Sequence, residues 1–317
     1  MYILSSARLR TPIKESLVST FPEMTFLFAN RMNEGQHHLH KADILITYGE
    51  DLTEELIEKA ERLKWIMVIS AGLEKMPFQI LKDKNILVTN ARGIHAIPMA
   101  EFAISCLLQS AKQTKKLYGH EEDKVWDRTV PMTEISGKTI GILGAGAIGT
   151  EIARLSKAFS MTTLGFSRSG TKGPHFNEVH SRPQDLPTVF ERCDFIVNVL
   201  PYTQETDRLI GTSLFTRMKR EAVFINIGRG RTVVEDELTQ ALQQEQFAHA
   251  FLDVFETEPL SETSPLWEME NVTVTPHLSS ITPQYQERAI ALFEENLRLY
   301  VKGNKELTNI IPLERGY

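Results

Sequence analysis

The segment Thr139-Ile140-Gly141-Ile142-Leu143-Gly144-Ala145-Gly146-Ala147-Ile148-Gly149 decides the fold of this chain. Its first five residues form an apolar run typical of a buried strand, and Ile148, Ile152 and Leu155 follow at helical spacing. In such a turn one glycine permits the tight bend, one lets the backbone approach a pyrophosphate, and one lets the helix pack on the strand. The start of the helix offers free N–H groups and the positive end of its dipole to an anion. The segment therefore predicts the phosphate-binding turn of a dinucleotide-binding unit, made by Gly144, Gly146, Ala147, Ile148 and Gly149.

The place of this turn in the chain predicts a split architecture. A dinucleotide-binding fold normally starts at its glycine-rich turn, so the residues before Thr139 must form something else. On both sides of the turn, short apolar runs alternate with helical stretches, which is typical of open parallel α/β sheets. We therefore expect an α/β protein with two doubly wound parallel-sheet domains. One consists of residues 1–97 and 286–317, and the other, a Rossmann domain, consists of residues 98–285.

The individual elements can be placed from the same alternation. The strands expected before the turn are Tyr2–Leu4, Met24–Phe28, Asp43–Tyr48, Trp65–Ile69 and Ile86–Thr89. Those expected after it are Thr162–Phe166, Phe195–Leu200, Ala222–Ile227, Ala248–Val254 and Asn271–Thr275. One long helix, Pro98–Leu117, is expected to bridge the domains. A second amphipathic helix, after Pro283, is expected to return to the first domain.

Composition argues against several classes of function. The net charge of −6 offers no basic patch for nucleic acid or an anionic membrane. No stretch approaches roughly 18 consecutive apolar residues, and the N-terminus lacks the features of a signal peptide, so we expect a soluble, cytoplasmic protein. Cys106 and Cys193 have apolar neighbours and are expected to be buried free thiols. The segment His37–His40 has no accompanying ligand framework, so we expect an exposed loop there and no metal site.

The residues after the second strand of the nucleotide-binding unit favour NADP over NAD. An NAD-specific unit carries an acidic residue about 20 positions beyond the glycines, where it binds the adenosine ribose. In this chain Ser167-Arg168 follows the run that ends at Phe166. A hydroxyl and a guanidinium can bind a ribose phosphate, which a carboxylate would repel. The alternative is a solvated turn whose arginine points into water, and with it NAD remains possible.

Three later residues are suited to acid–base chemistry. Arg229, Glu258 and His277 each lie at or just beyond the carboxyl end of an apolar run, which is the edge of an open α/β sheet where ligands bind. An arginine can pair with a carboxylate through two hydrogen bonds, and a histidine can exchange a proton near neutral pH. A glutamate beside that histidine would stabilise its protonated form. These are the groups needed to reduce a 2-oxo acid. Glu256 competes with Glu258 as the carboxylate beside His277.

Several motifs in a fixed order make the chain resemble the D-isomer-specific 2-hydroxyacid dehydrogenase family. They are the glycine turn, Val199-Leu200-Pro201 with Thr203 and Thr206, Asn226 to Gly230, Asp253 to Leu260, Asn271 to His277, and the earlier Asn90-Ala91-Arg92-Gly93. The resemblance is to glyoxylate/hydroxypyruvate reductases or phosphoglycerate dehydrogenases without a regulatory domain. It implies a flavodoxin-like substrate domain, an inserted Rossmann cofactor domain, and a homodimer built around the region of Trp126.

The resemblance also implies roles for single residues. Arg229 would bind and polarise the substrate, and His277 would donate the proton in a reduction that yields a D-2-hydroxy acid. Glu258 would partner His277, and it is preferred to Glu256 because it directly precedes Pro259. Further cofactor contacts are implied at Leu200, Pro201, Thr206, Ile227, Gly228, Asp253, Ser279 and Ser280. The substrate carboxylate would be received by the loop of Ala71, Gly72 and Leu73.

Two other functions stay open on the sequence alone. A dinucleotide-sensing regulatory protein needs only the nucleotide pocket, whereas the set of Arg229, Glu258 and His277 favours an enzyme. An NAD-dependent dehydrogenase of the phosphoglycerate type would prefer NAD, and Ser167-Arg168 speaks against that preference. Within the reductase interpretation, glyoxylate, hydroxypyruvate and larger 2-oxo acids are all candidate substrates.

Overall fold

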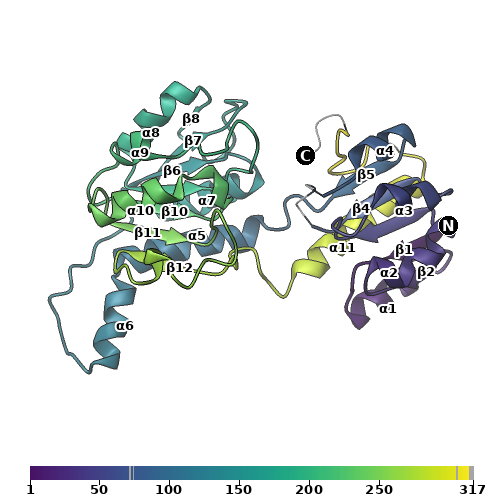
Figure 1. Cartoon of the computed structure of the whole chain (residues 1–317), viewed down its shortest axis with the longest axis horizontal. Helices are drawn as coiled ribbons and strands as arrows, with labels where there is room; N and C mark the ends of the chain where they lie inside the picture. The colour runs from purple at the N-terminus through teal and green to yellow at the C-terminus, as the bar shows by residue number, and fades with distance from the viewer. Residues whose placement is uncertain (71–72, 74, 305, 314–317) are drawn as a thin grey trace. The chain divides into compact units, whose positions relative to one another are not determined.

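The computed structural model describes residues 1–70, 73, 75–304 and 306–313. The chain divides into two compact units, one formed by Met1–Ile94 with Thr282–Tyr317 and the other by His95–Ile281 (Figure 1). Each unit contains one parallel sheet with flanking helices. The expected fold class, two parallel-sheet α/β domains with one inserted into the other, is therefore confirmed.

The first unit has the strand order β2-β1-β3-β4-β5, which is the flavodoxin-like order. Its strands are β1 (Tyr2–Ser5), β2 (Thr25–Phe28), β3 (Ile44–Thr47), β4 (Trp65–Val68) and β5 (Leu87–Asn90). Its helices are α1 (Thr11–Thr20), α2 (Met32–Gly35), α3 (Glu54–Lys59), α4 (Phe78–Asp83) and α11 (Tyr285–Val301), with a 3-10 helix at Gln36–Lys41.

Alternate residues along this sheet enter two separate cores. Ile44 and Ile46 belong to the core formed with α1 and α11, whereas Leu45 between them belongs to the core formed with α2, α3 and α4. All four residues of β3 are buried, because helices cover both faces of the sheet. For this reason the central strands read as continuous apolar runs in the sequence.

The second unit has the strand order β12-β11-β10-β9-β6-β7-β8. Counted from β6, this is the Rossmann order with one further strand, β12. Its strands are β6 (Thr139–Leu143), β7 (Thr162–Phe166), β8 (Glu178–His180), β9 (Phe195–Asn198), β10 (Val223–Asn226), β11 (His249–Leu252) and β12 (Val272–Val274). Its helices are α5 (Ala96–Ala111), α6 (Thr114–Glu122), α7 (Ala147–Ala158), α8 (Leu186–Arg192), α9 (Thr212–Phe215) and α10 (Glu235–Gln243), with 3-10 helices at Pro183–Asp185, Gly230–Thr232 and Pro265–Trp267.

Two local expectations are wrong. The segment Pro98–Leu117 is not one helix, because Gln113 between α5 and α6 has a φ of 53°, a left-handed conformation that interrupts a right-handed helix. The segment His37–His40 lies in a 3-10 helix rather than a loop, and although His37 and His40 are exposed as expected, Leu39 is fully buried in the core. The expected buried free thiols are present at Cys106 and Cys193, and burial raises the pKa of each to about 12.

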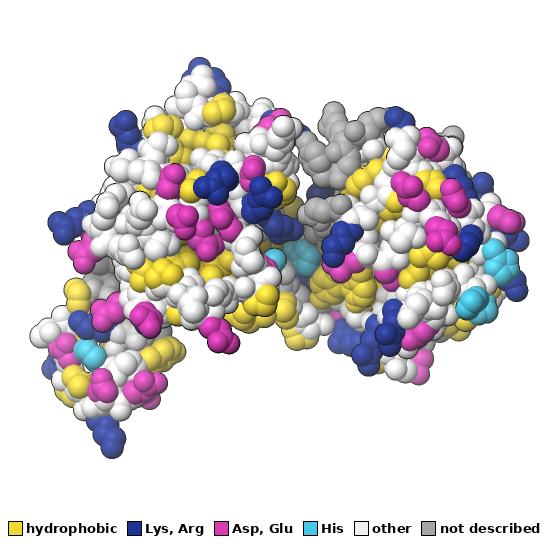
Figure 2. All heavy atoms as spheres, in the orientation of Figure 1, with side chains coloured by type: hydrophobic (Ala, Val, Ile, Leu, Met, Phe, Trp, Pro, Cys, Tyr) yellow, Lys and Arg dark blue, Asp and Glu magenta, His cyan; other side chains and the backbone are white. Residues whose placement is uncertain are grey.

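Helix α6 projects from the rest of its unit (Figure 1). No residue of α6 is buried, and Trp126 in the segment that follows is 92% exposed. Figure 2 shows hydrophobic, acidic and basic side chains mixed on this projection. Among the described residues, no helix is both long and apolar enough to cross a membrane. The cytoplasmic location stays a prediction.

Candidate active site

The glycine turn between β6 and α7 has one glycine open to a ligand and two required by the fold. A Cβ at Gly149 would lie 2.0 Å from the carbonyl oxygen of Gly144, and a Cβ at Gly144 would lie 3.0 Å from that of Val199. A Cβ at Gly146 would meet no described atom within 4 Å, and Gly146 is exposed, like Ala147 at the start of α7. The exposed backbone at the start of a twelve-residue helix therefore fits the diphosphate of a dinucleotide.

The turn after β7 presents a hydroxyl and a guanidinium. The Oγ atom of Ser167 is buried and has no hydrogen-bond partner among the described residues. The Nη1 atom of Arg168 lies 3.9 Å from the Oε2 atom of Glu205, and both side chains are largely exposed. A buried polar atom without a partner has lost its hydrogen bonds to water. A hydrogen bond to a ligand oxygen would replace them. The two residues therefore fit a ribose phosphate.

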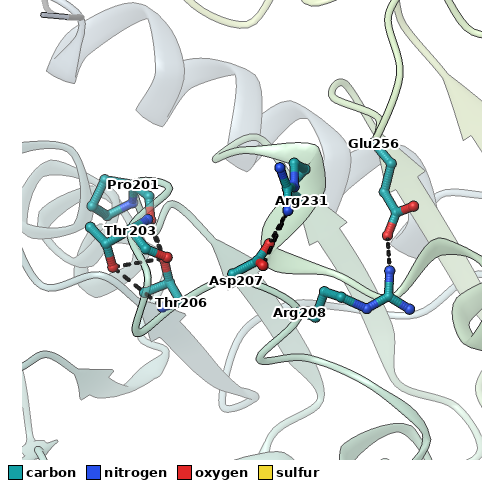
Figure 3. Close-up of polar contacts among 7 residues, drawn as sticks. All are labelled: Pro201, Thr203, Thr206, Asp207, Arg208, Arg231 and Glu256. Carbon is teal, nitrogen blue, oxygen red and sulfur yellow. Dashed lines mark hydrogen bonds and ion pairs between the residues drawn. The ribbon is translucent and has the colours of Figure 1, made fainter. Parts of the chain in front are cut away.

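The loops after β9 and β10 come into close contact. A Cβ at Gly228 would lie 2.8 Å from the carbonyl oxygen of Leu200, so this approach requires glycine. The hydroxyl of Thr206 donates to the carbonyl oxygen of Pro201 at 2.7 Å and accepts from the backbone N–H of Thr203 at 2.8 Å (Figure 3). Thr206 therefore shapes its own loop, and its expected cofactor contact stays a prediction.

Arg229 follows the carboxyl end of β10, directly after the buried pair Ile227-Gly228. Its Nη1 atom donates to the carbonyl oxygen of Gly228 at 2.9 Å, which uses one of the five N–H groups of the guanidinium. The loop is held by Asn198 at the end of β9, whose Nδ2 atom donates to Asn226 at 2.9 Å and to Thr232 at 2.7 Å. Asn198 and Thr232 are residues that sequence reasoning missed, because their pairing spans 34 positions of the chain.

His277 and Glu258 meet across the loops that follow β12 and β11. The Nδ1 atom of His277 lies 2.8 Å from the Oε2 atom of Glu258, and the two side chains are 45% and 37% exposed. The Oε1 atom of Glu258 accepts a hydrogen bond from the backbone N–H of Phe255 at 3.1 Å. Glu256 pairs with Arg208 instead, at 2.8 Å. With Nδ1 engaged by the carboxylate, Nε2 is the ring atom left to exchange a proton with a substrate.

Asp253 holds the turn that carries His277. It is 1% exposed, and its carboxylate accepts from the hydroxyl of Thr275 at 2.6 Å and from the backbone N–H groups of Leu278 at 2.8 Å and Ser279 at 2.9 Å. The backbone N–H of His277 donates to the carbonyl oxygen of Asp253 at 2.9 Å. Ser279 is itself 3% exposed. The sequence suggested cofactor contacts for Asp253, Ser279 and Ser280, and those contacts stay predictions.

The expected substrate loop belongs to the first unit. Of its three residues, Ala71 and Gly72 lie outside the described part of the chain. Leu73 is 5% exposed and packs in the same core as Met76. The contact of this loop with a substrate carboxylate stays a prediction.

Comparison with known proteins defines the class of this chain. The model of the NAD-binding domain of the D-isomer-specific 2-hydroxyacid dehydrogenases matches residues 104–279. Glyoxylate/hydroxypyruvate reductase B of Salmonella paratyphi A is 31% identical over 277 residues, which cover 86% of this chain and 85% of the relative. D-3-phosphoglycerate dehydrogenase of Methanocaldococcus jannaschii is 31% identical over 264 residues, which cover 83% of this chain but 50% of the relative. The chain belongs to the D-isomer-specific 2-hydroxyacid dehydrogenase family.

Solved structures agree with this assignment. A D-isomer-specific 2-hydroxyacid dehydrogenase family protein of Aeromonas salmonicida has a TM-score of 0.84 and 31% identity, over 98% of this chain and 99% of that one. The NADPH-dependent glyoxylate/hydroxypyruvate reductase of Sinorhizobium meliloti, in complex with NADP and sulfate, has a TM-score of 0.82 and 25% identity, over 100% and 99%. The chain is thus an NAD(P)-dependent oxidoreductase for 2-oxo and 2-hydroxy acids, and the comparisons favour this function over a dinucleotide sensor.

Proposed function

We propose that this chain reduces a small 2-oxo acid of the glyoxylate or hydroxypyruvate type with NADPH. The observation that carries the proposal is the contact of 2.8 Å between Nδ1 of His277 and Oε2 of Glu258, at the sheet edge where Arg229 also lies. Proton donor, carboxylate partner and cation follow three consecutive strands, β12, β11 and β10. Relatives of this chain that carry the name glyoxylate/hydroxypyruvate reductase support the substrate class.

In this mechanism the bound cofactor supplies the hydride that reaches the carbonyl carbon. His277 gives the proton on Nε2 to the carbonyl oxygen, which becomes the hydroxyl of the product. Glu258 stabilises the protonated imidazole and fixes the orientation of its ring. Arg229 binds the substrate and offsets the negative charge that develops during the transfer. Preorganised charge contributes most when it stabilises charge that develops in the transition state.

The two domains expected from the sequence, whose bounds lie within four residues of those of the two units, have separate functions in this proposal. The substrate domain comprises residues 1–97 and 286–317, and its loop of Ala71, Gly72 and Leu73 receives the substrate carboxylate. The cofactor domain comprises residues 98–285 and binds the diphosphate on the glycine turn. Leu200, Pro201, Thr206, Ile227, Gly228, Asp253, Ser279 and Ser280 complete the cofactor site.

NADPH is the preferred cofactor in this proposal, because of the turn after β7. Ser167 contributes a buried hydroxyl without a partner among the described residues, and Arg168 contributes a guanidinium. The carboxylate of Glu205 lies 3.9 Å from that guanidinium and is 73% exposed, so a ribose phosphate can replace this contact at little cost.

A rate assay of His277→Asn beside the wild type tests the function. Wild-type protein is expected to oxidise NADPH with glyoxylate or hydroxypyruvate, and the variant is expected to lose about 10²- to 10⁴-fold in kcat, the usual contribution of a general acid. Dinucleotide affinity, followed by fluorescence titration, is expected to persist in the variant. Tight dinucleotide binding without turnover on any 2-oxo acid would overturn the proposal and favour a sensor.

A further inference from the structure

Three loops at the carboxyl edge of the second sheet converge on Glu256. The Nη1 atom of Arg208, in the loop after β9, lies 2.8 Å from the Oε1 atom of Glu256, in the loop after β11 (Figure 3). The backbone N–H of Glu256 donates to the Oε2 atom of Glu235, the first residue of α10, at 2.9 Å. Glu256 is thus held from its side chain and from its backbone by two different segments.

The loop after β10 contacts the peptide bond between Phe255 and Glu256. A Cβ at Gly230 would lie 1.9 Å from both the carbonyl carbon and the carbonyl oxygen of Phe255, and 2.6 Å from the backbone nitrogen of Glu256. Gly230 directly follows Arg229, and Glu256 lies two positions before Glu258. The cation and the carboxylate of the active site are therefore carried by two loops in van der Waals contact.

The backbone of Arg208 is itself held by a hydrogen bond. Its backbone N–H donates to the carbonyl oxygen of Arg231 at 2.7 Å, and the side chain of Arg231 pairs with Asp207 at 3.1 Å. Figure 3 shows the two arginines reaching in different directions, Arg231 toward Asp207 and Arg208 toward Glu256. Arg208 therefore extends from the anchored loops after β9 and β10 to the loop that bears Glu258.

We propose that Arg208 is a positioning residue for the acid–base pair: its ion pair with Glu256 holds the loop after β11 so that the carboxylate of Glu258 stays on Nδ1 of His277. This inference rests on the proposed function. Arg208 does not touch the reacting atoms, and it acts through Glu256 and the short chain segment from Glu256 to Glu258. Arg208 lies outside the motifs that carry the family resemblance, whereas Glu256 lies within one of them, Asp253 to Leu260.

Removal of the ion pair is expected to cost little stability. The side chains of Arg208 and Glu256 are 52% and 32% exposed, and exposed ion pairs contribute little to stability. The chain also offers a matched control, because Arg217 pairs with Glu191 at the same distance of 2.8 Å with exposures of 56% and 47%. That second pair joins the segment after α9 to α8 and does not involve the loops of the acid–base pair.

The kinetic test compares Arg208→Met with Arg217→Met. In Arg208→Met, kcat is expected to fall about tenfold, because small displacements of catalytic groups have large effects on rate, while KM for NADPH stays within about twofold. The alkaline limb of the rate profile is expected to move to lower pH, because Glu258 no longer stabilises the protonated His277. Arg208→Lys, which keeps the ion pair, is expected to recover most of the rate. A kcat and a pH profile in Arg208→Met equal to those of Arg217→Met would overturn the proposal.

An NMR titration separates this inference from the proposed function. The Cε1–H signal of His277, assigned with His277→Asn, reports the midpoint of imidazole protonation without any substrate. The midpoint is expected to fall in Arg208→Met and to stay unchanged in Arg217→Met. If wild-type protein turns over no 2-oxo acid but this difference appears, the positioning role stands and the proposed function fails. If turnover is measured and the midpoints agree, the positioning role fails alone.

Discussion

Some residues at this site are explained by the close approach of two backbone segments, and others by the chemistry of their side chains. Gly230 is required because the backbone of Phe255 occupies the space that a side chain would fill. The Oγ atom of Ser167 is buried at the point where an acid would select NAD, so this residue is the most informative about the cofactor. Neither property can be read from the neighbouring residues, because each depends on a segment that lies elsewhere in the chain.

The cofactor preference can be tested at Arg168. Arg168→Ala is expected to raise KM for NADPH about tenfold to hundredfold, since a hydrogen bond to a charged group contributes about 1.5–3 kcal/mol. The KM for NADH is expected to stay within about twofold, because NADH has no ribose phosphate. Initial rates with both cofactors measure the effect, and Arg182→Ala, which removes an exposed arginine paired with Asp185, is the control. Equal increases for NADPH and NADH would contradict the assignment.

At the scale of elements, parallel strands were the easiest to predict and helix ends the hardest. Central strands such as β3 and β4 are fully buried, so their apolar runs are unbroken and stand out in the sequence. The three-residue strand β8 has no fully buried residue, which explains why it was not expected. The break between α5 and α6 depends on the left-handed backbone of Gln113, a residue type without a strong preference for that conformation.

His249, at the start of β11, gives the second sheet a pH-dependent stability. Burial, together with the nearby charge of Lys115, lowers the pKa of His249 from 6.5 to about 4. The unfolded chain takes up this proton near pH 6.5, so the stability contributed by the neutral histidine is present above that pH and is lost as the pH falls toward 4. The complete loss corresponds to roughly 3 kcal/mol.

Urea unfolding at a series of pH values tests this contribution. His249→Gln, which can keep a hydrogen bond to Thr273, is expected to lose less free energy of unfolding than the wild type as the pH falls through this range. His37→Gln replaces an exposed histidine and is expected to behave as the wild type does. If the pH dependence of His249→Gln matched that of the wild type, the histidine would not be the group responsible.

At the scale of the whole molecule, the projecting α6 points to assembly. A helix without a buried residue, followed by a tryptophan that is 92% exposed, cannot be explained by the core of its own unit. We propose a homodimer in which this projection packs on a second copy of the chain. Large aromatic residues commonly dominate the binding energy of such interfaces.

Replacing the exposed tryptophan tests this assembly. Trp126→Ser is expected to raise the dimer dissociation constant at least about thirtyfold, the effect of losing a strong contact residue. Sedimentation equilibrium measures the constant directly. Trp267→Ser, at a tryptophan that is 50% exposed and lies outside the projection, is expected to leave the constant unchanged. A monomeric wild-type protein would rule out the homodimer.

The sequence by itself determined the fold class, the place of the nucleotide-binding turn and the family, because periodic apolar runs and closely spaced glycines are local signals. It also singled out Arg229, Glu258 and His277, which lie at the ends of such runs. The family resemblance also preferred Glu258 to Glu256, and in the structure Glu258 contacts His277. Only the tertiary structure decided that Glu256 pairs with Arg208 and that Asp253 holds the turn of His277. These choices depend on distances between loops that are 19 to 48 residues apart in the chain, and such distances are set by the packing of parallel strands rather than by local sequence.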